Sequence, residues 1–125
     1  MTTLEIIRRI AQVEFGDIVT FSELLGKKLR LYLSDRSFID IYISQTIKNR
    51  FAFHWERQHL DGKIYRFDNF PDTKWKKVRS FPYHLHSGSQ NRVIKANFSQ
   101  AIIAGFRDFM CFAQRNIKSD NKKVT

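Results

Sequence analysis

Hydrophobic residues recur at helical spacing near both ends of the chain and at every second position in between. Near the start, apolar residues at positions 4, 6, 7, 10 and 11 predict a short helix, and Thr2 with Glu5 forms the pattern of a capping box. Near the end, apolar and aromatic residues from Phe98 to Ile117 recur at helical spacing and predict a second helix, with Asn97 as its N-cap. An aromatic stripe of this kind is typical of a helix that faces the core.

The middle of the chain alternates apolar and polar residues, as strands do when they bury one face. Four segments show this pattern, and the turn signals SDRS and LDG lie between them: residues 29–34, 37–44, 50–57 and 63–69. Residues 16–26 are compatible with a further strand or with an extension of the first helix. We therefore predict an α+β domain: an antiparallel sheet of four to six strands with the N- and C-terminal helices packed on one face.

If the helices cover one face of this sheet, the other face displays the polar strand positions. Neighbouring strands lie about 4.8 Å apart, so these side chains would form one contiguous surface. It is either an ordinary solvated face or a binding face, and the tyrosines and the histidine among the charges favour binding. The residues expected there are Arg30, Tyr32, Asp40, Tyr42, His54, Glu56, Arg66 and Asp68.

The length of 125 residues suits one domain, which we place at 1–117, followed by a basic, disordered tail at 118–125. The mean hydropathy of −0.42 and the lack of a long apolar run predict no membrane span. Arginines lie inside the first apolar pattern, not before it, which argues against a signal peptide. The single cysteine, Cys111, cannot form an internal disulfide, which is compatible with a cytoplasmic protein.

Positive charge is concentrated in the second half of the chain. The net charge is +10; residues 1–61 carry nine Lys and Arg against eight Asp and Glu, whereas residues 62–125 carry thirteen against four. Such an excess points to a polyanionic partner, which could be a nucleic acid, an acidic protein or an anionic membrane. A solvated basic surface without a partner remains the alternative.

The stretch YRFDNFPDTKWKKVRSFPYHLHSG, residues 65–88, carries most of the candidate chemistry. Trp75 can stack on a base or fix the loop to the core, and the basic side chains around it can neutralise phosphates. These basic residues are Lys74, Lys76, Lys77 and Arg79. Just before them, Asp68 and Asn69 precede Pro71, where capping of a turn fits as well as catalysis, and Arg66 can pair with Asp68 or hold a phosphate.

In an extended chain, His84 and His86 project from the same face, about 6.6 Å apart at about 3.3 Å per residue. Three roles fit this spacing: a metal site that needs a further ligand, an acid–base pair or phosphate contact, and a structural pair bonded to the backbone. The chain contains no P-loop, no Gly-x-Gly-x-x-Gly and no nucleophile elbow, so no nucleotide-binding or hydrolase motif competes with these roles.

The stretches YRFDNFPD and SFPYHLH, with a short basic spacer between them, resemble the signature of the TumE-like toxins of bacterial and archaeal toxin–antitoxin systems. The resemblance covers about residues 15–110, with RFAFHWER in place of the family's aromatic strand. Asp72 and Tyr83 stand where members usually carry histidine. The resemblance implies a cognate antitoxin, a helix-turn-helix protein encoded nearby. The matching positions are Arg66, Asp68, Asn69, Pro71, Phe81, Pro82, His84 and His86.

These features together predict a toxin that acts on RNA as a metal-independent endoribonuclease with no cofactor. RNA carries its own nucleophile, the 2′-hydroxyl, so a base, an acid and a cation at the phosphate suffice. The predicted catalytic residues are His84, His86, Arg66, Asp68, His54 and Arg79. The predicted nucleic-acid contacts are Lys74, Trp75, Lys76, Lys77, Arg30, Tyr32, Tyr42 and Arg92, and the predicted turn residues are Asn69, Pro71 and Pro82.

Two other functions fit the same sequence. A nucleic-acid-binding module without catalysis would share the basic surface but would not need the histidines. A basic interaction protein would dock an acidic partner and bind no nucleic acid. The sequence is compatible with a homo-oligomer and leaves the RNA target open.

Overall fold

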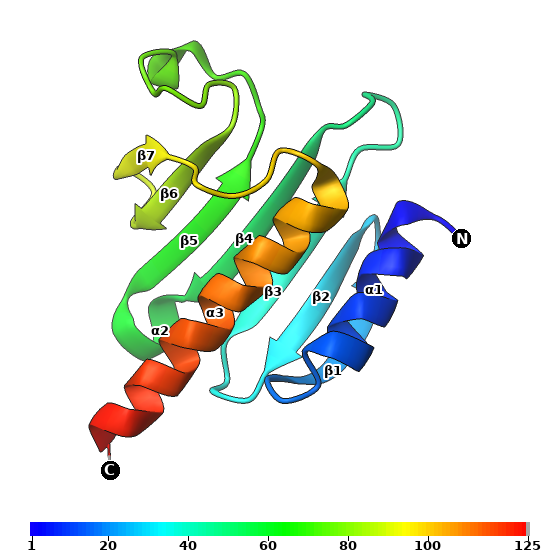
Figure 1. Cartoon of the computed structure of the whole chain (residues 1–125), viewed down its shortest axis with the longest axis vertical. Coiled ribbons are helices and arrows are strands. Elements are labelled where there is room, and N and C mark those ends of the chain that lie inside the picture. The colour runs from blue at the N-terminus through cyan, green and yellow to red at the C-terminus, as the bar shows by residue number, and fades with distance from the viewer. Residues whose placement is uncertain (125) are drawn as a thin grey trace.

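Seven strands form one antiparallel sheet in which each strand pairs with the next one along the chain. The computed structural model describes residues 1–124, and Figure 1 shows the arrangement of its elements. The strands are β1 (Val19–Leu25), β2 (Lys28–Leu33), β3 (Phe38–Ile43), β4 (Phe51–Arg57), β5 (Lys63–Asp68), β6 (His84–Gly88) and β7 (Val93–Lys95). The helices are α1 (Thr3–Glu14), α2 (Gln58–Asp61), the 3-10 turn η1 (Thr73–Trp75) and α3 (Ile102–Val124).

The predicted α+β class, with a helix at each end of an antiparallel sheet, is confirmed, but the prediction of four to six strands is wrong. The ambiguous segment 16–26 contains β1, not an extension of α1. The other extra strands are β6 and β7, which have only five and three residues. They lack the apolar alternation of a half-buried strand because two positions of β6 are histidines, so the sequence pattern does not reveal them.

The first helix begins as the sequence predicts, whereas the last one is displaced. Thr2 Oγ1 accepts a hydrogen bond from the Glu5 backbone N–H. The Glu5 carboxylate in turn accepts one from the Thr2 backbone N–H, which completes the capping box. α3 begins at Ile102 instead of directly after Asn97, because Ser99 first forms a turn in which its hydroxyl accepts from Ala101. α3 extends to Val124, so residues 118–124, predicted as a disordered tail, lie within the helix.

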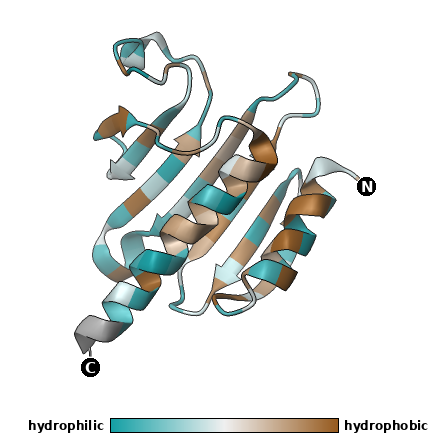
Figure 2. Cartoon of the chain, viewed as in Figure 1, coloured by the Kyte–Doolittle hydropathy of each residue, from teal (hydrophilic) through white to brown (hydrophobic). Residues whose placement is uncertain are grey.

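The core lies between the sheet and the two long helices, which both pack on one face (Figure 1). Alternate strand residues point into it, and Figure 2 shows the resulting bands of apolar and polar positions along the strands. Trp55 is fully buried there, with its indole N–H donating to the Ser37 hydroxyl at 2.8 Å. Large apolar side chains fill the remainder, among them Leu31, Ile41, Phe51, Phe53, Phe67, Phe106, Phe109 and Met110.

The opposite face of the sheet carries the polar residues expected there. Strand pairing places Arg30, Asp40, His54, Arg66 and His86 side by side in one row across β2 to β6. A second row contains Tyr42, Ala52, Asp68 and His84. The face that the helices leave uncovered is therefore a polar surface, and two histidines of β6 join it.

Within residues 1–124, no helix is both long and apolar enough to cross a membrane.

Candidate active site

Pairing of β5 with β6 gathers four of the predicted catalytic side chains at one place on the uncovered face. Arg66 lies directly opposite His86, and Asp68 lies directly opposite His84. Because residues two apart on a strand share a face, all four side chains point to the same side. They line a cleft of about 240 Å³. The loop from β5 to β6 adds Phe70, Asp72, Lys74 and Trp75 to its wall, and the turn from β6 to β7 adds Gln90 and Asn91.

Asp68 is the centre of this cluster and only 2% exposed. Its Oδ1 lies 3.2 Å from His84 Nε2 and accepts a hydrogen bond from the Phe70 backbone N–H at 2.9 Å. Its Oδ2 accepts from Arg66 Nε at 3.0 Å and lies 3.7 Å from His86 Nε2. Burial acts to raise the pKa of the carboxyl, but the hydrogen bonds and the positive charges outweigh it and lower that pKa. Asp68 is therefore an ionised carboxylate.

The environment of His84 favours the charged imidazolium. Its Nδ1 lies 2.9 Å from the Pro82 carbonyl oxygen and donates to it, since a carbonyl can only accept. Nε2 must then also carry a proton to donate to Asp68. Burial lowers the pKa of His84, but the hydrogen bond to Asp68 and its negative charge outweigh burial, and the pKa is raised.

His86, two residues away, is in the opposite state. Its Nδ1 donates to the Gln90 carbonyl oxygen at 2.9 Å, which leaves Nε2 as the nitrogen that faces the cleft. At 3.7 Å, Nε2 is too far from Asp68 Oδ2 for a hydrogen bond. Burial is the largest influence on the pKa of His86 and lowers it, while the Gln90 carbonyl and the Asp68 charge offset only part of that effect. His86 is therefore a neutral imidazole with a lone pair on Nε2.

Arg66 brings a positive charge to the mouth of the cleft. Its Nε is bound to Asp68, and about 31% of its side chain remains exposed. Among the residues whose side chains the structure describes, 1–121, its two terminal nitrogens have no hydrogen-bond partner. A guanidinium held at one edge and free at the other can bind a phosphate oxygen with the free N–H groups.

Asp68, His84 and His86 also fit a set of metal ligands. Each offers one ligand atom, and these atoms lie within 4.8 Å of one another. Both Nδ1 atoms donate to backbone carbonyls, as histidines that bind metal through Nε2 usually do. A cation here would have to displace the proton on His84 Nε2 and approach a carboxylate that Arg66 already neutralises. Those contacts favour proton chemistry over metal binding.

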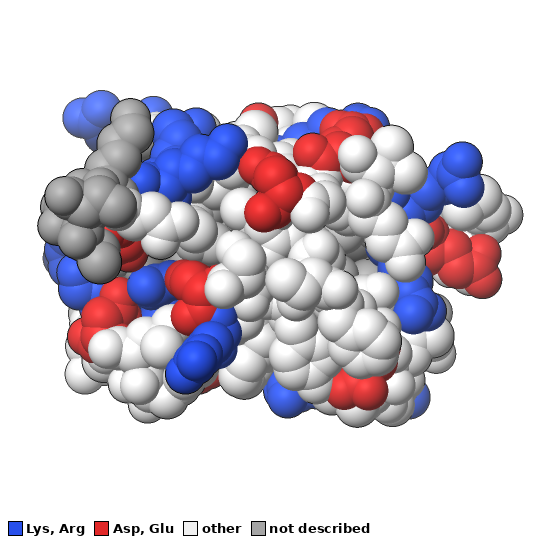
Figure 3. Space-filling model, turned by 90° about the horizontal axis from the view of Figure 1, so that it is seen from below, with Lys and Arg blue, Asp and Glu red and all other residues white. Residues whose placement is uncertain are grey.

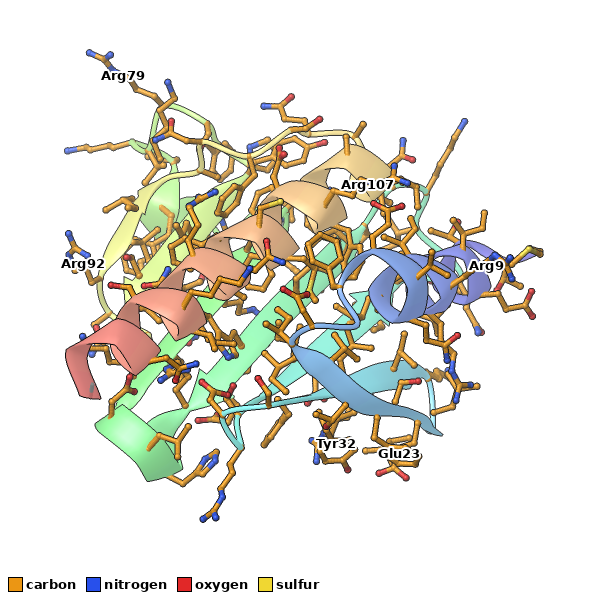
Figure 4. The ribbon with its side chains drawn as sticks, turned by 60° about the horizontal axis from the view of Figure 1, so that its bottom comes forward. Arg9, Glu23, Tyr32, Arg79, Arg92 and Arg107 are labelled. Atoms are coloured by element: carbon orange, nitrogen blue, oxygen red, sulfur yellow. The ribbon has the colours of Figure 1, made fainter. Side chains whose placement is uncertain are left out.

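The structure separates the other predicted catalytic residues from this cluster. His54 lies beside Arg66 on β4, but its Nε2 is 3.3 Å from Glu56 and it lines a neighbouring cleft instead. Arg79 is exposed on the loop between β5 and β6, and Figure 4 shows it pointing away from the domain. Neither residue lines the cleft around Asp68.

The predicted nucleic-acid contacts fall into four groups. Lys74 and Trp75 line the cleft, and Tyr42 lines the neighbouring one. Lys76 and Lys77 are exposed on the same loop as Arg79. The remaining three make contacts within the chain: Arg30 forms a two-point pair with Asp40 at 2.8 and 3.0 Å, Tyr32 donates to Glu23 beside it (Figure 4), and Arg92 donates to Ser87.

The predicted turn residues make backbone contacts. Asn69 is buried, where its Oδ1 accepts from Phe51 N–H and its Nδ2 donates to the Asn49 carbonyl. Pro71 is exposed where the β5–β6 loop leaves the sheet. The Phe81–Pro82 peptide bond is cis, and the Pro82 carbonyl accepts the proton of His84 Nδ1.

Both positions that depart from the family signature have structural contacts. The Tyr83 ring packs on Phe51 and Phe67, with centroids 6.1 and 6.4 Å away, so it belongs to the core side of the strand. Asp72 caps η1 by accepting from the Lys74 backbone N–H. A histidine at position 83 would face the core and not the cleft, so its absence removes no group from the cluster.

Sequence reasoning missed Phe70 and Gln90, which line the cleft, and Lys28, which lines the neighbouring one. Gln90 takes part through its backbone carbonyl, for which no side-chain pattern exists. At the end of the molecule opposite the β5–β6 loop, Figure 3 shows basic and acidic side chains interspersed around uncharged ones.

A family model described as toxin TumE matches residues 4–117, which includes every strand and both motifs of the β5–β6 region. No curated protein and no solved structure matches the chain. The match covers most of the 125 residues and confirms the resemblance that the two motifs indicate. The chain therefore belongs to the TumE toxin family, which gives it the role of a toxin and implies a cognate antitoxin as its partner.

Proposed function

We propose that this toxin acts on RNA as a metal-independent endoribonuclease in which His86 is the general base and His84 the general acid. The observation that carries the proposal is the opposite state of these two rings in one cleft. The pKa of His84 is raised and that of His86 is lowered, so an acid and a base coexist near neutral pH. Neighbouring titratable groups whose pKa values are pushed apart are the usual sign of an acid–base pair.

The reaction needs only groups that line the cleft. His86 Nε2 takes the proton of a ribose 2′-hydroxyl while the 2′ oxygen forms a bond to the adjacent phosphorus. The bond from phosphorus to the 5′ oxygen breaks. The proton on His84 Nε2, which the resting site directs to Asp68 Oδ1, must turn from that carboxylate to reach the leaving 5′ oxygen. The products are a 2′,3′-cyclic phosphate end and a 5′-hydroxyl end, with His86 protonated and His84 neutral.

Arg66 and Asp68 support this proton transfer. The free nitrogens of Arg66, which lines the cleft, would stabilise the negative charge that develops on the phosphorane oxygens. Asp68 is a positioning residue, because it holds both Arg66 and the protonated ring of His84 without meeting the substrate itself. On the surrounding loop, Lys76, Lys77 and Arg79 would contact phosphates outside the cleft.

Substitution of each histidine tests the assignment. We expect His86→Asn and His84→Asn each to lower the rate of RNA cleavage by about 10²–10⁴-fold, the usual contribution of an acid or base, and to relieve growth inhibition. His59→Asn is the matched control, since His59 is exposed on α2 and bonded to the Arg36 carbonyl. Full cleavage of RNA by the double His84, His86 variant would overturn the proposal.

A nucleic-acid-binding module is the second candidate, because Lys76, Lys77 and Arg79 form an exposed basic loop beside the cleft. It predicts that the wild-type chain binds RNA without cutting it and that charge reversal of the loop abolishes binding.

We further infer that the antitoxin is a helix-turn-helix protein encoded beside this toxin. Sequencing of the adjacent reading frame tests that inference.

A further inference from the structure

Arg66 separates two clefts on the uncovered sheet face. One is the cleft around Asp68, and the other has a volume of about 300 Å³. The second cleft extends from Arg66 across β4 to β3 and β2, and its wall includes His54 and Tyr42. Apart from Arg66, the proposed reaction uses no group of this second cleft, and the role of the cleft is therefore open.

Aromatic rings flank Arg66 and the two histidines on both sides. On the β6 side, the Trp75 ring meets His86 at 90°, with centroids 6.1 Å apart, and Lys74 Nζ lies 5.0 Å from its centroid. On the β3 side, Phe70 and Tyr42 stack on each other with centroids 6.2 Å apart and planes at 28°.

Cations lie over the second pair of rings as well. The guanidinium carbon of Arg50 is 5.1 Å from the Phe70 centroid, and that of Arg66 is 5.9 Å from it. Both sides of the cluster therefore combine a ring that can stack on a base with a cation that can meet a phosphate. Between them lie the acid, the base and the free nitrogens of Arg66.

We propose that the two clefts together bind single-stranded RNA, with one unpaired base against Trp75 and a neighbouring base against Phe70 and Tyr42. This inference rests on the proposed function and adds the class of substrate. The phosphodiester between the two bases then lies at Arg66. The path from β6 to β3 crosses three strand spacings, about 14 Å at about 4.8 Å each; the Trp75 ring meets His86 of β6 at one end, and Tyr42 belongs to β3 at the other.

The rings explain the preference for single strands. In a duplex the base faces are stacked on one another, so a side chain can reach them only where the strand is unpaired. A basic surface without rings would bind duplex and single strand alike through the phosphates. Stacking also tolerates any base, because every base has a flat aromatic face.

The test measures binding separately from cleavage. An eight-nucleotide RNA with 2′-fluoro groups, which lacks the nucleophile, is labelled with a fluorophore and titrated with the protein as a single strand and as a duplex. We expect tighter binding of the single strand. Trp75→Ala and Tyr42→Ala should each weaken it roughly 5- to 150-fold, the range for loss of one base stack, with little effect on duplex affinity.

Phe21→Ala provides the matched control, because Phe21 is an aromatic residue of the edge strand β1, 59% exposed and outside both clefts. Circular dichroism of each variant verifies that the fold is retained. Equal affinity of the wild-type chain for duplex and single strand, or unchanged single-strand affinity in both the Trp75 and Tyr42 variants, would overturn the inference.

The two proposals fail in different ways. In one outcome, the toxin binds single-stranded RNA more weakly after loss of Trp75 or Tyr42, as expected, and yet does not cleave the same oligonucleotide with ordinary 2′-hydroxyl groups. That result supports single-strand binding across the two clefts and contradicts the proposed nuclease activity. Cleavage of duplex RNA at the same rate as single-stranded RNA supports the nuclease activity and contradicts single-strand binding across the two clefts.

Discussion

Asp68 and His84 are cross-strand partners on β5 and β6, and their side chains meet with 3.2 Å between Oδ1 and Nε2. Both are almost fully buried, so the ion pair is shielded from solvent. Opposite charges that are held this close in a buried place stabilise each other's ionised forms. The carboxylate therefore fixes the proton on His84, while His86, beyond hydrogen-bond reach of it, stays neutral.

The roles proposed for the two histidines predict a bell-shaped dependence of RNA cleavage on pH. His86 must be neutral, so the rate rises as pH increases through its pKa, which lies below the ordinary value of about 6.5. His84 must be protonated, so the rate falls as pH increases through its pKa, which lies above that value. We expect the rate to be highest between these two pKa values, which lie on either side of 6.5. Cleavage of a fluorogenic RNA from pH 4 to pH 10 measures the profile.

The His86→Asn variant is the control for this profile, since its residual cleavage should lose the acidic limb and keep the alkaline one. A rate that rises steadily to pH 10 would contradict the assignment of His84 as the acid.

Asp68→Asn should shift the alkaline limb of the same profile to lower pH. The amide keeps the shape of the side chain but removes the negative charge that raises the pKa of His84. Loss of one partner from a buried pair also destabilises a fold, by about 3 kcal/mol at the lower end of the usual range. Urea unfolding of the wild type and the variant measures the difference in their free energies of unfolding. If the alkaline limb of the variant's pH–rate profile is unchanged, Asp68 does not set the protonation of His84.

The sign of this stability difference depends on pH. The pKa of His84 is raised in the fold, so its stabilisation is full below about pH 6.5 and is lost as pH rises through the higher folded value. The pKa of Asp68 is lowered, so its share is lost only when pH falls through that lowered value. The difference in free energy of unfolding between wild type and Asp68→Asn should therefore be larger at pH 6 than at pH 9. Asp17→Asn, which changes an exposed carboxylate, is the control: its difference from wild type should be the same at both pH values.

Chelation separates proton chemistry from metal chemistry at this cluster. If His84, His86 and Arg66 supply acid, base and charge as proposed, RNA cleavage should continue at its full rate after dialysis against EDTA. A metal-dependent nuclease assayed in the same buffer is the control and should lose its activity. If EDTA abolishes cleavage by the toxin and Mn²⁺ or Zn²⁺ restores it, Asp68, His84 and His86 are metal ligands instead.

Local sequence determined the two long helices and the strands β2 to β5, together with the side to which the strand residues point. The capping box at Thr2, the aromatic stripe from Phe98 to Ile117 and the alternation from Leu29 to Asp68 each reflect interactions within a few residues. The polar face of the sheet followed from the same alternation, and the two motifs around Asp68 and His86 identified the family. Such features depend on neighbours along the chain, so a single sequence contains them.

Only the tertiary structure decided which of these residues lie together and which charge state their surroundings favour. The register of β5 with β6 places Asp68 against His84, while Arg79 points outward and His54 joins another cleft. The carbonyls of Pro82 and Gln90 fix the two imidazoles, and no side-chain pattern encodes a backbone acceptor. Pairing across strands and burial depend on contacts that are distant along the chain, which is why the sequence supplied the groups and the fold set their chemistry.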